Sequence, residues 1–318
     1  MERFATELEY QNSSKDEVSY VVESDTVHYP AANSDPYPWK IIWSSAIPPG
    51  GFDENRVPWE GGTIGTDEKL IQYPLDFFDD KPSFFTAYYG IMLGLREIVI
   101  PKLPTNGYQY FLSGANNLRR IELGEGWKNS TLTSNLLLGA GSGSQGFSSR
   151  LDVIFPKEIG ESYFSGLVSS CVYPEICNTL TIPKYRSPGD AFVTIPERVS
   201  NIICSSDACK ELILTGPASS LTLNFAYVNG YLSRLILKKG VTTINCTSQN
   251  YSNITEIIIK TTTMPTTSPI IAKTIGETGK GRLVIPSSKI SDYRNRIINN
   301  SPYLIDPNDL SNWEIIGI

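Results

Sequence analysis

The chain has 318 residues, of which 40% are hydrophobic and 19% charged, and its formal charge at pH 7 is -6. This composition is typical of a folded protein with one or two domains, and the scattered lysines and arginines argue against nucleic-acid binding. No apolar run is long enough for a transmembrane helix, so we expect no membrane insertion. The first ten residues are charged where a signal peptide would be apolar, so we also expect no secretory leader.

Residues 1–90 follow no repeat and are rich in aromatic residues, proline and glycine. We predict an aromatic-rich domain of strands and loops that caps the rest of the chain or serves in assembly. Tyrosine and tryptophan are also enriched in protein interfaces, and the two roles are compatible. The candidate assembly contacts are Trp39, Trp43, Trp59, Phe77 and Phe78.

This N-terminal region also holds the residues that would matter most in an enzyme. Asp76, Asp79 and Asp80 lie beside two phenylalanines, a combination found in carbohydrate-active sites, but closeness in sequence does not give the separation that two catalytic carboxylates need. His28 is the single histidine, and no Gly-x-Ser-x-Gly motif accompanies it. We therefore predict a structural or exposed histidine, an acidic loop, no catalytic residues and a protein that is not an enzyme.

From about Leu95 to Ile285 the sequence repeats a short segment of the form Leu-x-x-Ile-x-Ile, often followed by proline. Apolar and polar residues alternate in each copy, as in a strand with one buried face. The steps between copies run from 22 residues (235 to 257) to 32 residues (121 to 153), and the shortest have leucine-rich-repeat length. The positions that this alignment makes equivalent are Ile98, Ile121, Val153, Leu180, Leu212, Leu235, Ile257 and Leu283.

The repeats predict a mainly β fold in which residues 91–318 form a leucine-rich-repeat-like solenoid with irregular repeats. Solenoids present extended surfaces that suit binding, and the polar residues of the strands point away from the core. A solvated charged surface is the alternative interpretation of these residues. The candidate recognition face consists of Arg96, Arg119, Glu122, Lys210, Glu211, Arg234 and Glu256.

Two further features of the repeat region favour structure over chemistry. The segment 139–146 contains the spacing Gly-x-Gly-x-x-Gly, but we predict a strand after it where a dinucleotide site needs a helix, so we expect an inserted loop. The five cysteines include no Cys-x-x-Cys pair, and we expect Cys204, Cys209 and Cys246 to be small buried residues with reduced thiols. The sequence therefore predicts no metal and no cofactor.

The last residues predict a cap for the second end of the solenoid, over about 281–318. In residues 287–298, Ile290, Tyr293 and Ile297 lie near one face of an amphipathic helix, with a serine to cap its start. A final strand is predicted over residues 313–318.

Three segments of this region, in this order, resemble the closing unit of BspA-like leucine-rich repeat proteins. They are Thr261-Thr-Thr-Met-Pro265, Arg282-Leu-Val-Ile-Pro286 followed by the helix with Tyr293, and Trp313-Glu-Ile-Ile316. The resemblance covers about residues 93–318. It implies a repeat protein of a kind common in anaerobic gut bacteria, where such proteins act in adhesion and protein binding and have no catalytic residues.

The chain differs from the common bacterial form in its aromatic N-terminal region and in the expected absence of a leader. We therefore predict a phage-encoded member of the family, a virion component that serves as a head, collar or tail decoration or as a host-binding accessory. It would be made in the host cytoplasm, and its partners would be virion neighbours, a protein or glycan on the host surface, or further copies of itself. The alternatives are a bacterial cell-surface adhesin or protein-binding protein, and a carbohydrate-active enzyme.

Overall fold

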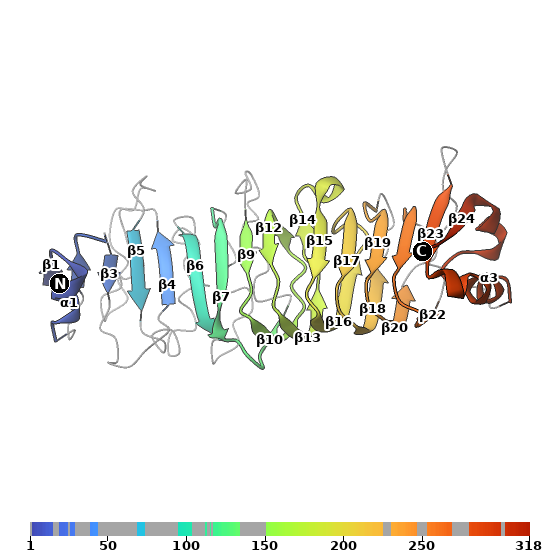
Figure 1. The fold of residues 1–318 in the computed structure, drawn as a ribbon. Helices are drawn as coiled ribbons and strands as arrows, with labels where there is room; N and C mark the ends of the chain where they lie inside the picture. The colour runs from blue at the N-terminus through green and yellow to red at the C-terminus, as the bar shows by residue number, and fades with distance from the viewer. Residues whose placement is uncertain are drawn as a thin grey trace. The chain divides into compact units, whose positions relative to one another are not determined.

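A computed structural model shows a mainly β protein with several parallel sheets and few helices (Figure 1). It describes residues 2–14, 19–24, 26–28, 39–43, 69–73, 95–103, 112, 115, 117–133, 151–224, 230–246, 253–268, 280–299 and 303–318. The chain divides into two compact units. Unit 1 comprises residues 1–156 and 170–172, and unit 2 comprises residues 157–169 and 173–318. No helix in the described ranges has the length and apolar character needed to cross a membrane.

Unit 1 contains one sheet of nine strands, which we call sheet I. In spatial order its strands are β1 (Glu2–Phe4), β2 (Ser19–Val21), β3 (Thr26–His28), β5 (Lys69–Tyr73), β4 (Trp39–Trp43), β6 (Leu95–Lys102), β7 (Arg120–Gly126), β9 (Asp152–Ile154) and β12 (Ser170–Val172). Strands β6, β7, β9 and β12 pair in parallel, whereas β4 is antiparallel to both of its neighbours. Sheet I therefore takes strands from both sides of the domain boundary predicted near residue 90.

The remaining described elements of unit 1 are short. Thr6 is the N-cap of helix α1 (Glu7–Gln11), and its hydroxyl accepts a hydrogen bond of 3.2 Å from the backbone N–H of Glu9. This is the usual way in which an N-cap satisfies one of the unpaired amides of the first turn. Strand β8 (Thr131–Leu132) follows β7.

The core of unit 1 follows the predicted alternation. Ile98, Ile121 and Val153 are direct partners on β6, β7 and β9, and all are buried. The sequence alignment of these three positions is thus confirmed by the strand register. Trp127 is also buried, and its indole Nε1 donates a hydrogen bond of 2.9 Å to the carbonyl of Ile100. A buried indole needs such an acceptor because an unpaired N–H in the core is costly.

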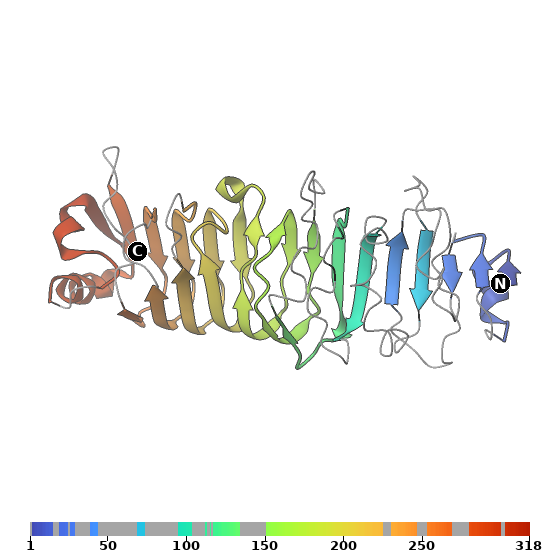
Figure 2. The same ribbon diagram turned by 180° about the vertical axis from the view of Figure 1, so that it is seen from behind.

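Unit 2 contains two larger parallel sheets between which successive strands alternate (Figures 1 and 2). Sheet II consists, in order, of β15 (Phe192–Ile195), β17 (Glu211–Leu214), β19 (Arg234–Leu237), β21 (Glu256–Ile259), β23 (Gly281–Ile285) and β24 (Trp313–Gly317). Sheet III contains β10 (Glu158–Ser162), β13 (Ile176–Thr181), β16 (Arg198–Ser205), β18 (Ala218–Asn224), β20 (Val241–Cys246) and β22 (Thr266–Ser268). A small third sheet pairs β11 (Leu167–Val168) with β14 (Lys184–Tyr185), and a 3-10 turn, η1 (Pro188–Asp190), precedes β15.

The buried face of sheet II confirms four of the aligned positions. Leu212, Leu235, Ile257 and Leu283 are direct partners on neighbouring strands, and each is fully buried. In-register parallel pairing brings equivalent positions of successive steps together, which is why the spacing of the apolar residues predicted the contacts.

Leu180 was wrongly aligned with these positions. It lies on β13 in sheet III, where its partner is Ile202, and the true partner of Leu212 in the preceding strand is Val193. The repeat pattern also predicted one strand per step, whereas each step here adds a second strand, such as β16 or β18, to sheet III. Both errors have one cause, because a strand has the same two-residue side-chain period in either sheet.

The predicted C-terminal helix and strand are present. Residues 287–289 form a 3-10 turn, η2 (Ser287–Lys289), that continues into α3 (Ile290–Asn299). Tyr293 and Ile297 are buried, and β24 pairs in parallel with β23. The predicted serine cap is wrong, because the residue at the N-cap is Pro286 and no side chain caps this end. A further 3-10 helix, η3 (Pro307–Asn312), leads into β24.

Candidate functional site

Three of the predicted recognition residues come together on the outward face of sheet II. Glu211, Arg234 and Glu256 occupy one register position on β17, β19 and β21, and Arg282 extends the row on β23. Arg234 Nη1 lies 2.7 Å from Glu211 Oε2, and its Nε donates to Glu256. Arg282 Nη1 lies 2.9 Å from Glu256 Oε1. We call these four residues the ion-pair row.

The charges of the ion-pair row balance one another. The hydrogen bond that Arg234 donates to Glu211 is the main reason why the pKa of Arg234 is raised above its ordinary value, so this arginine stays charged at every physiological pH. The Glu211 side chain is only 8% exposed, and its carboxylate is held by Arg234. The two acids and two arginines of the row have no net charge among themselves, and the exposed Glu314 holds the same register position on β24. The ion-pair row therefore positions side chains more than it attracts an ionic ligand.

An aliphatic row lies beside the ion-pair row, two residues further along each strand. Its members are direct partners from β17 to β24; Ile236 and Val284 are buried at 8% and 7% exposure, whereas the other three are half-buried: Ile213, Ile258 and Ile316. This row was not predicted from the sequence. The unbroken apolar run Leu212-Ile-Leu214 indicates it, because strict alternation would place a polar residue between the two leucines.

Lys210, the fourth predicted recognition residue of unit 2, lies outside the ion-pair row. It precedes β17, is exposed, and its Nζ lies 5.8 Å from the ring centroid of Phe192. Phe192 is 65% exposed at the start of β15 and shares the register position of Glu211. The row of charges in sheet II thus begins with an exposed ring and a cation above it, an arrangement that contributes a cation–π attraction.

The three predicted recognition residues of unit 1 lie on β6, β7 and the residues just before them. Arg119 Nη2 is 2.8 Å from Glu97, and Glu122 is 2.8 Å from Arg120. The backbone carbonyl of Arg96 accepts a hydrogen bond of 2.7 Å from the N–H of Arg119. Surface ion pairs of this kind contribute little to stability, so their place on the surface is of more interest than their energy.

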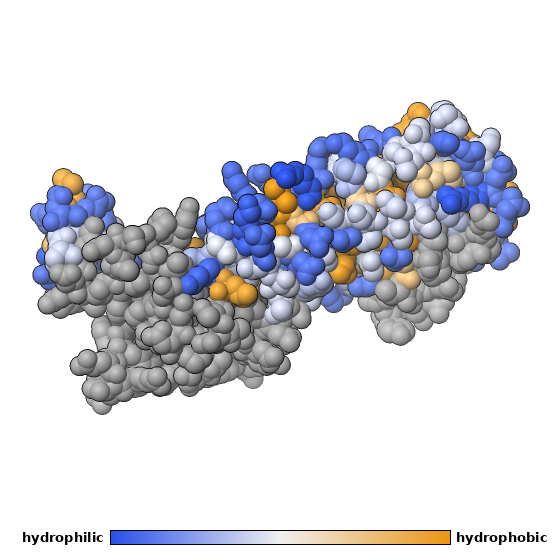
Figure 3. Space-filling model, turned by 90° about the horizontal axis from the view of Figure 1, so that it is seen from below, coloured by the Kyte–Doolittle hydropathy of each residue, from blue (hydrophilic) through white to orange (hydrophobic). Residues whose placement is uncertain are grey.

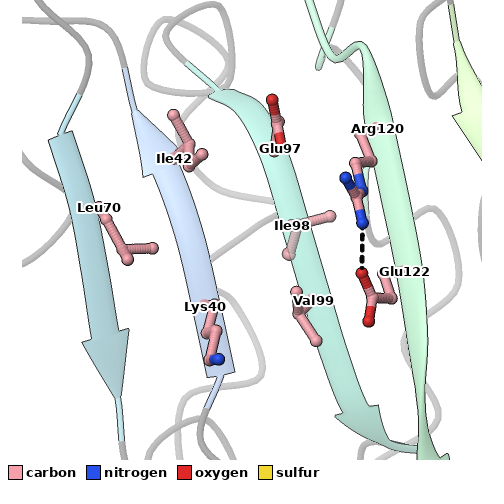
Figure 4. Close-up of a pocket in the computed structure, with 8 residues that line it drawn as sticks. All are labelled: Lys40, Ile42, Leu70, Glu97, Ile98, Val99, Arg120 and Glu122. Atoms are coloured by element: carbon pink, nitrogen blue, oxygen red, sulfur yellow. Dashed lines mark hydrogen bonds and ion pairs between the residues drawn. The ribbon is translucent and has the colours of Figure 1, made fainter.

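A shallow hollow of about 240 Å³ lies beside these ion pairs on sheet I (Figure 4). Side chains of four neighbouring strands line it, and the Arg120–Glu122 pair forms one wall. The other lining residues are Lys40, Ile42, Leu70, Glu97, Ile98 and Val99. The hollow is smaller than most sites for drug-sized ligands, which measure roughly 300–1,000 Å³.

The candidate assembly contacts are mostly outside the described residues. Trp39 and Trp43 are the exceptions. Trp39 lies on β4 and is 1% exposed, so it belongs to the core of unit 1 and offers no contact surface. Trp43 ends the same strand. The other members, Trp59, Phe77 and Phe78, lie outside the described residues, as do Asp76, Asp79, Asp80 and the glycine-rich segment 139–146.

His28 is a buried residue of unit 1, so the exposed position that the sequence also allowed is not the one observed. It ends β3, is 7% exposed, and stacks on Tyr10 with ring centroids 4.1 Å apart and planes inclined by 15°. Its Nε2 lies 3.6 Å from Glu7 Oε1. Burial, with a smaller effect of Glu7, raises the pKa of the Tyr10 hydroxyl. The ring is thus held between a tyrosine and a carboxylate of helix α1.

The cysteines predicted to be buried are buried. Cys204, Cys209 and Cys246 are all at most 8% exposed, and the five cysteines are all free thiols. Burial raises the pKa of Cys246 to about 12, while the hydrogen bond between Cys204 and Cys209, together with burial, raises the pKa of Cys204 well above its ordinary value. In the part of the chain that the structure describes, no three His, Cys, Asp or Glu residues are grouped to hold a metal ion.

One further ion pair lies at a turn of unit 2. Lys184 Nζ on β14 is 2.6 Å from Asp207 Oδ2, and the hydroxyl of Ser205 donates to the other carboxylate oxygen. Partial burial raises the pKa of Asp207, but the two hydrogen bonds and the lysine charge outweigh it and hold the pKa below its ordinary value. The pair was missed because its members are 23 residues apart.

The surface outside these rows is mainly polar. On the face shown in Figure 3, most of the coloured surface is hydrophilic or intermediate, and the hydrophobic residues occupy separate small areas. The chain matches no protein-family model, no curated protein and no solved structure.

Proposed function

We propose that the protein is a non-enzymatic recognition protein, built as a leucine-rich-repeat-like solenoid with irregular repeats. The observation that carries this proposal is the order of the outward face of sheet II. Neighbouring strands place equivalent side chains in register, so that the aliphatic row runs beside the neutral ion-pair row. An apolar centre with a polar border is the usual arrangement of a protein–protein interface, and side chains already fixed lose little entropy on binding.

The solenoid part of the proposal is supported by the step lengths in unit 2. Partner residues are 19 positions apart between Phe192 and Glu211 and 26 apart between Glu256 and Arg282. A typical leucine-rich repeat adds one strand and a helix or 3-10 turn per step. The steps here add two strands, so the protein is a variant of that plan. The positions of β23, α3 and β24 agree with the resemblance to the closing unit of BspA-like proteins.

An enzyme is less well supported by the described residues. His28 is buried in a stack with Tyr10, and the hollow on sheet I is small and open. The outward carboxylates of sheet II are neutralised by arginines, which suits a binding surface better than acid–base chemistry.

The recognition role can be tested with one lysine substitution in the aliphatic row and one outside it. Labelled wild-type protein, Ile258→Lys and Ser165→Lys are incubated with host cells and with purified phage particles, and the bound fraction is measured by fluorescence. Ile258 lies in the middle of the row, whereas Ser165 is an exposed residue of unit 2 that lies outside the strands. We expect only Ile258→Lys to lose binding. Equal binding by all three proteins would refute sheet II as the recognition face.

The placement of the protein, on a virion or on a bacterial surface, is tested separately. Phage particles and cell envelopes from the source culture are purified, and both are searched by mass spectrometry for peptides of this chain. Recovery in particles at a stoichiometry close to that of known structural proteins supports a virion component. Recovery from envelopes alone refutes that placement and supports an adhesin.

A further inference from the structure

Four central strands of sheet III carry one kind of side chain on their outward face. Strands β13, β16, β18 and β20 each place two adjacent outward residues between buried ones and a third outward residue two positions later, and Thr266 of β22 continues the pattern. The pattern is bordered by charged residues, Glu161 on β10 and the exposed Arg198 at the start of β16. All residues of the pattern itself except Ile203 have a hydroxyl or an amide, and none is charged: Asn178, Thr179, Thr181, Ser200, Asn201, Ile203, Ser219, Ser220, Thr222, Thr242, Thr243, Asn245 and Thr266. We call this set the hydroxyl face.

The hydroxyl face is an ordered array. Thr179, Asn201, Ser220, Thr243 and Thr266 are direct partners on successive parallel strands. Because neighbouring strands lie about 4.8 Å apart, the polar groups repeat at a regular interval across the strands, and the second and third outward residues of each strand are about 6.6 Å apart. The inward residues between them are buried and hold the strands flat against the core.

Hydrogen bonds along the array fix some of its side chains. The hydroxyl of Ser220 donates to Asn201 Oδ1 at 2.9 Å, and Asn201 Nδ2 donates to the carbonyl of Asn178 at 3.1 Å. At the β10 end, Glu161 accepts from Thr179 at 3.4 Å and from Asn178 at 3.3 Å. Glu161 therefore marks the limit of the neutral array.

The two sheets of unit 2 differ in the partners they suit. Sheet II presents ion pairs and aliphatic residues, whereas the hydroxyl face contains no ion pair and, apart from Ile203, no aliphatic residue. A nucleic acid or another polyanion needs cations, and the centre of a protein interface is usually aliphatic or aromatic. Hydroxyls and amides both donate and accept hydrogen bonds, and so do the hydroxyls of a sugar. Their regular spacing suits a polymer that also repeats.

We propose that the hydroxyl face binds a neutral, extended polysaccharide. Each sugar makes hydrogen bonds that are weak by themselves, and the repetition of the array adds them along one chain. The absence of formal charge on the array matches the absence of charge on the ligand. This binding is independent of the recognition role proposed for sheet II.

Affinity electrophoresis in native gels tests the proposal with defined probes. The gels contain hydroxyethylcellulose, xyloglucan, galactomannan, arabinoxylan, dextran or pullulan, and each protein is compared with its own mobility in a gel without polysaccharide. The proteins are the wild type, Thr222→Lys and Thr243→Lys on the hydroxyl face, and the matched control Thr194→Lys, an exposed threonine of sheet II. Circular dichroism and thermal melting confirm that each variant is folded.

We expect at least one neutral polysaccharide to retard the wild type and Thr194→Lys equally. The two substitutions on the hydroxyl face should weaken that binding about ten-fold each, since each removes hydrogen bonds and inserts a charge. Absence of retardation of the wild type in all six gels would overturn the proposal, and so would equal retardation of all four proteins. If the wild-type protein inhibits ice recrystallisation and no gel retards it, the array binds an ice surface, and the polysaccharide proposal is overturned as well.

The polysaccharide proposal and the recognition role of sheet II can be refuted separately. Loss of cell binding in Ile258→Lys with no effect of any polysaccharide leaves the protein-recognition role in place and removes the glycan. Retardation that is lost in Thr243→Lys, together with normal cell binding by Ile258→Lys, supports polysaccharide binding and refutes recognition through sheet II.

Discussion

Replacing Arg234 with methionine removes the cation that holds two carboxylates in the ion-pair row. Methionine keeps much of the aliphatic length of the side chain, so the loss of packing is small. Glu211, whose side chain is 8% exposed, loses its contact of 2.7 Å. Glu256 loses one of its two arginines and keeps Arg282 at 2.9 Å. The substitution therefore leaves the nearly buried Glu211 carboxylate without its arginine, with the Glu256 carboxylate on the far side of β19.

The magnitude follows from the burial of the two partners. Removing one member of a fully buried pair costs about 3–5 kcal/mol, because the other charge is left without compensation. The Arg234 side chain is 43% exposed, so solvent already screens part of the interaction. We therefore expect a loss of about 1.5–3 kcal/mol in the free energy of unfolding, the range of a hydrogen bond to a charged group.

Urea denaturation followed by circular dichroism measures this loss. Adding Glu211→Gln to Arg234→Met should recover at least half of it, because the amide removes the uncompensated charge. The matched control is Lys239→Met, which breaks a pair with Glu197 in which both side chains are at least half exposed. That control should cost at most about 1 kcal/mol. Equal losses in Arg234→Met and Lys239→Met, or no recovery with glutamine, would refute this reasoning.

Three further predictions concern unit 2 and the cysteines. Gly216→Ala should destabilise the protein by more than about 1 kcal/mol in the same urea assay, because the new methyl group would lie 2.0 Å from a backbone oxygen. Gly240→Ala should be almost neutral, because its methyl group would lie 3.6 Å from the nearest atom. Equal effects of the two substitutions would contradict the close backbone approach at Gly216. Asp207 has a lowered pKa in the folded state, so it stabilises the fold above its ordinary pKa of 3.8 and loses this effect as the pH falls through the lowered value. The difference in stability between wild type and Asp207→Asn should therefore be present at pH 7 and shrink at acid pH, and a constant difference would argue against it. In native protein treated with iodoacetamide, mass spectrometry should find label on the partly exposed Cys171 long before Cys177, since burial raises the pKa of Cys177 to about 12; rapid labelling of Cys177 would show that this part of sheet III opens.

The sequence by itself predicted the buried lines of both units and the C-terminal elements. Leu212, Leu235 and Ile257 could be aligned because parallel strands in register place the same position of each step side by side. The spacing of Tyr293 and Ile297 likewise identified the buried side of α3, since those residues lie one turn apart on one face. These features depend on local periodicity, which the chain carries in its order of residues.

Only the tertiary structure decided which sheet each strand joins and which surface residues meet. Leu180 and Val193 have the same apolar pattern, yet one lies in sheet III and the other in sheet II. Arg234 contacts Glu211 and Glu256, which are 23 and 22 residues away, because parallel pairing brings successive steps together. The outward rows arise in the same way: a two-residue alternation says that a side chain leaves the core, but only the packing of neighbouring strands determines the residues beside it.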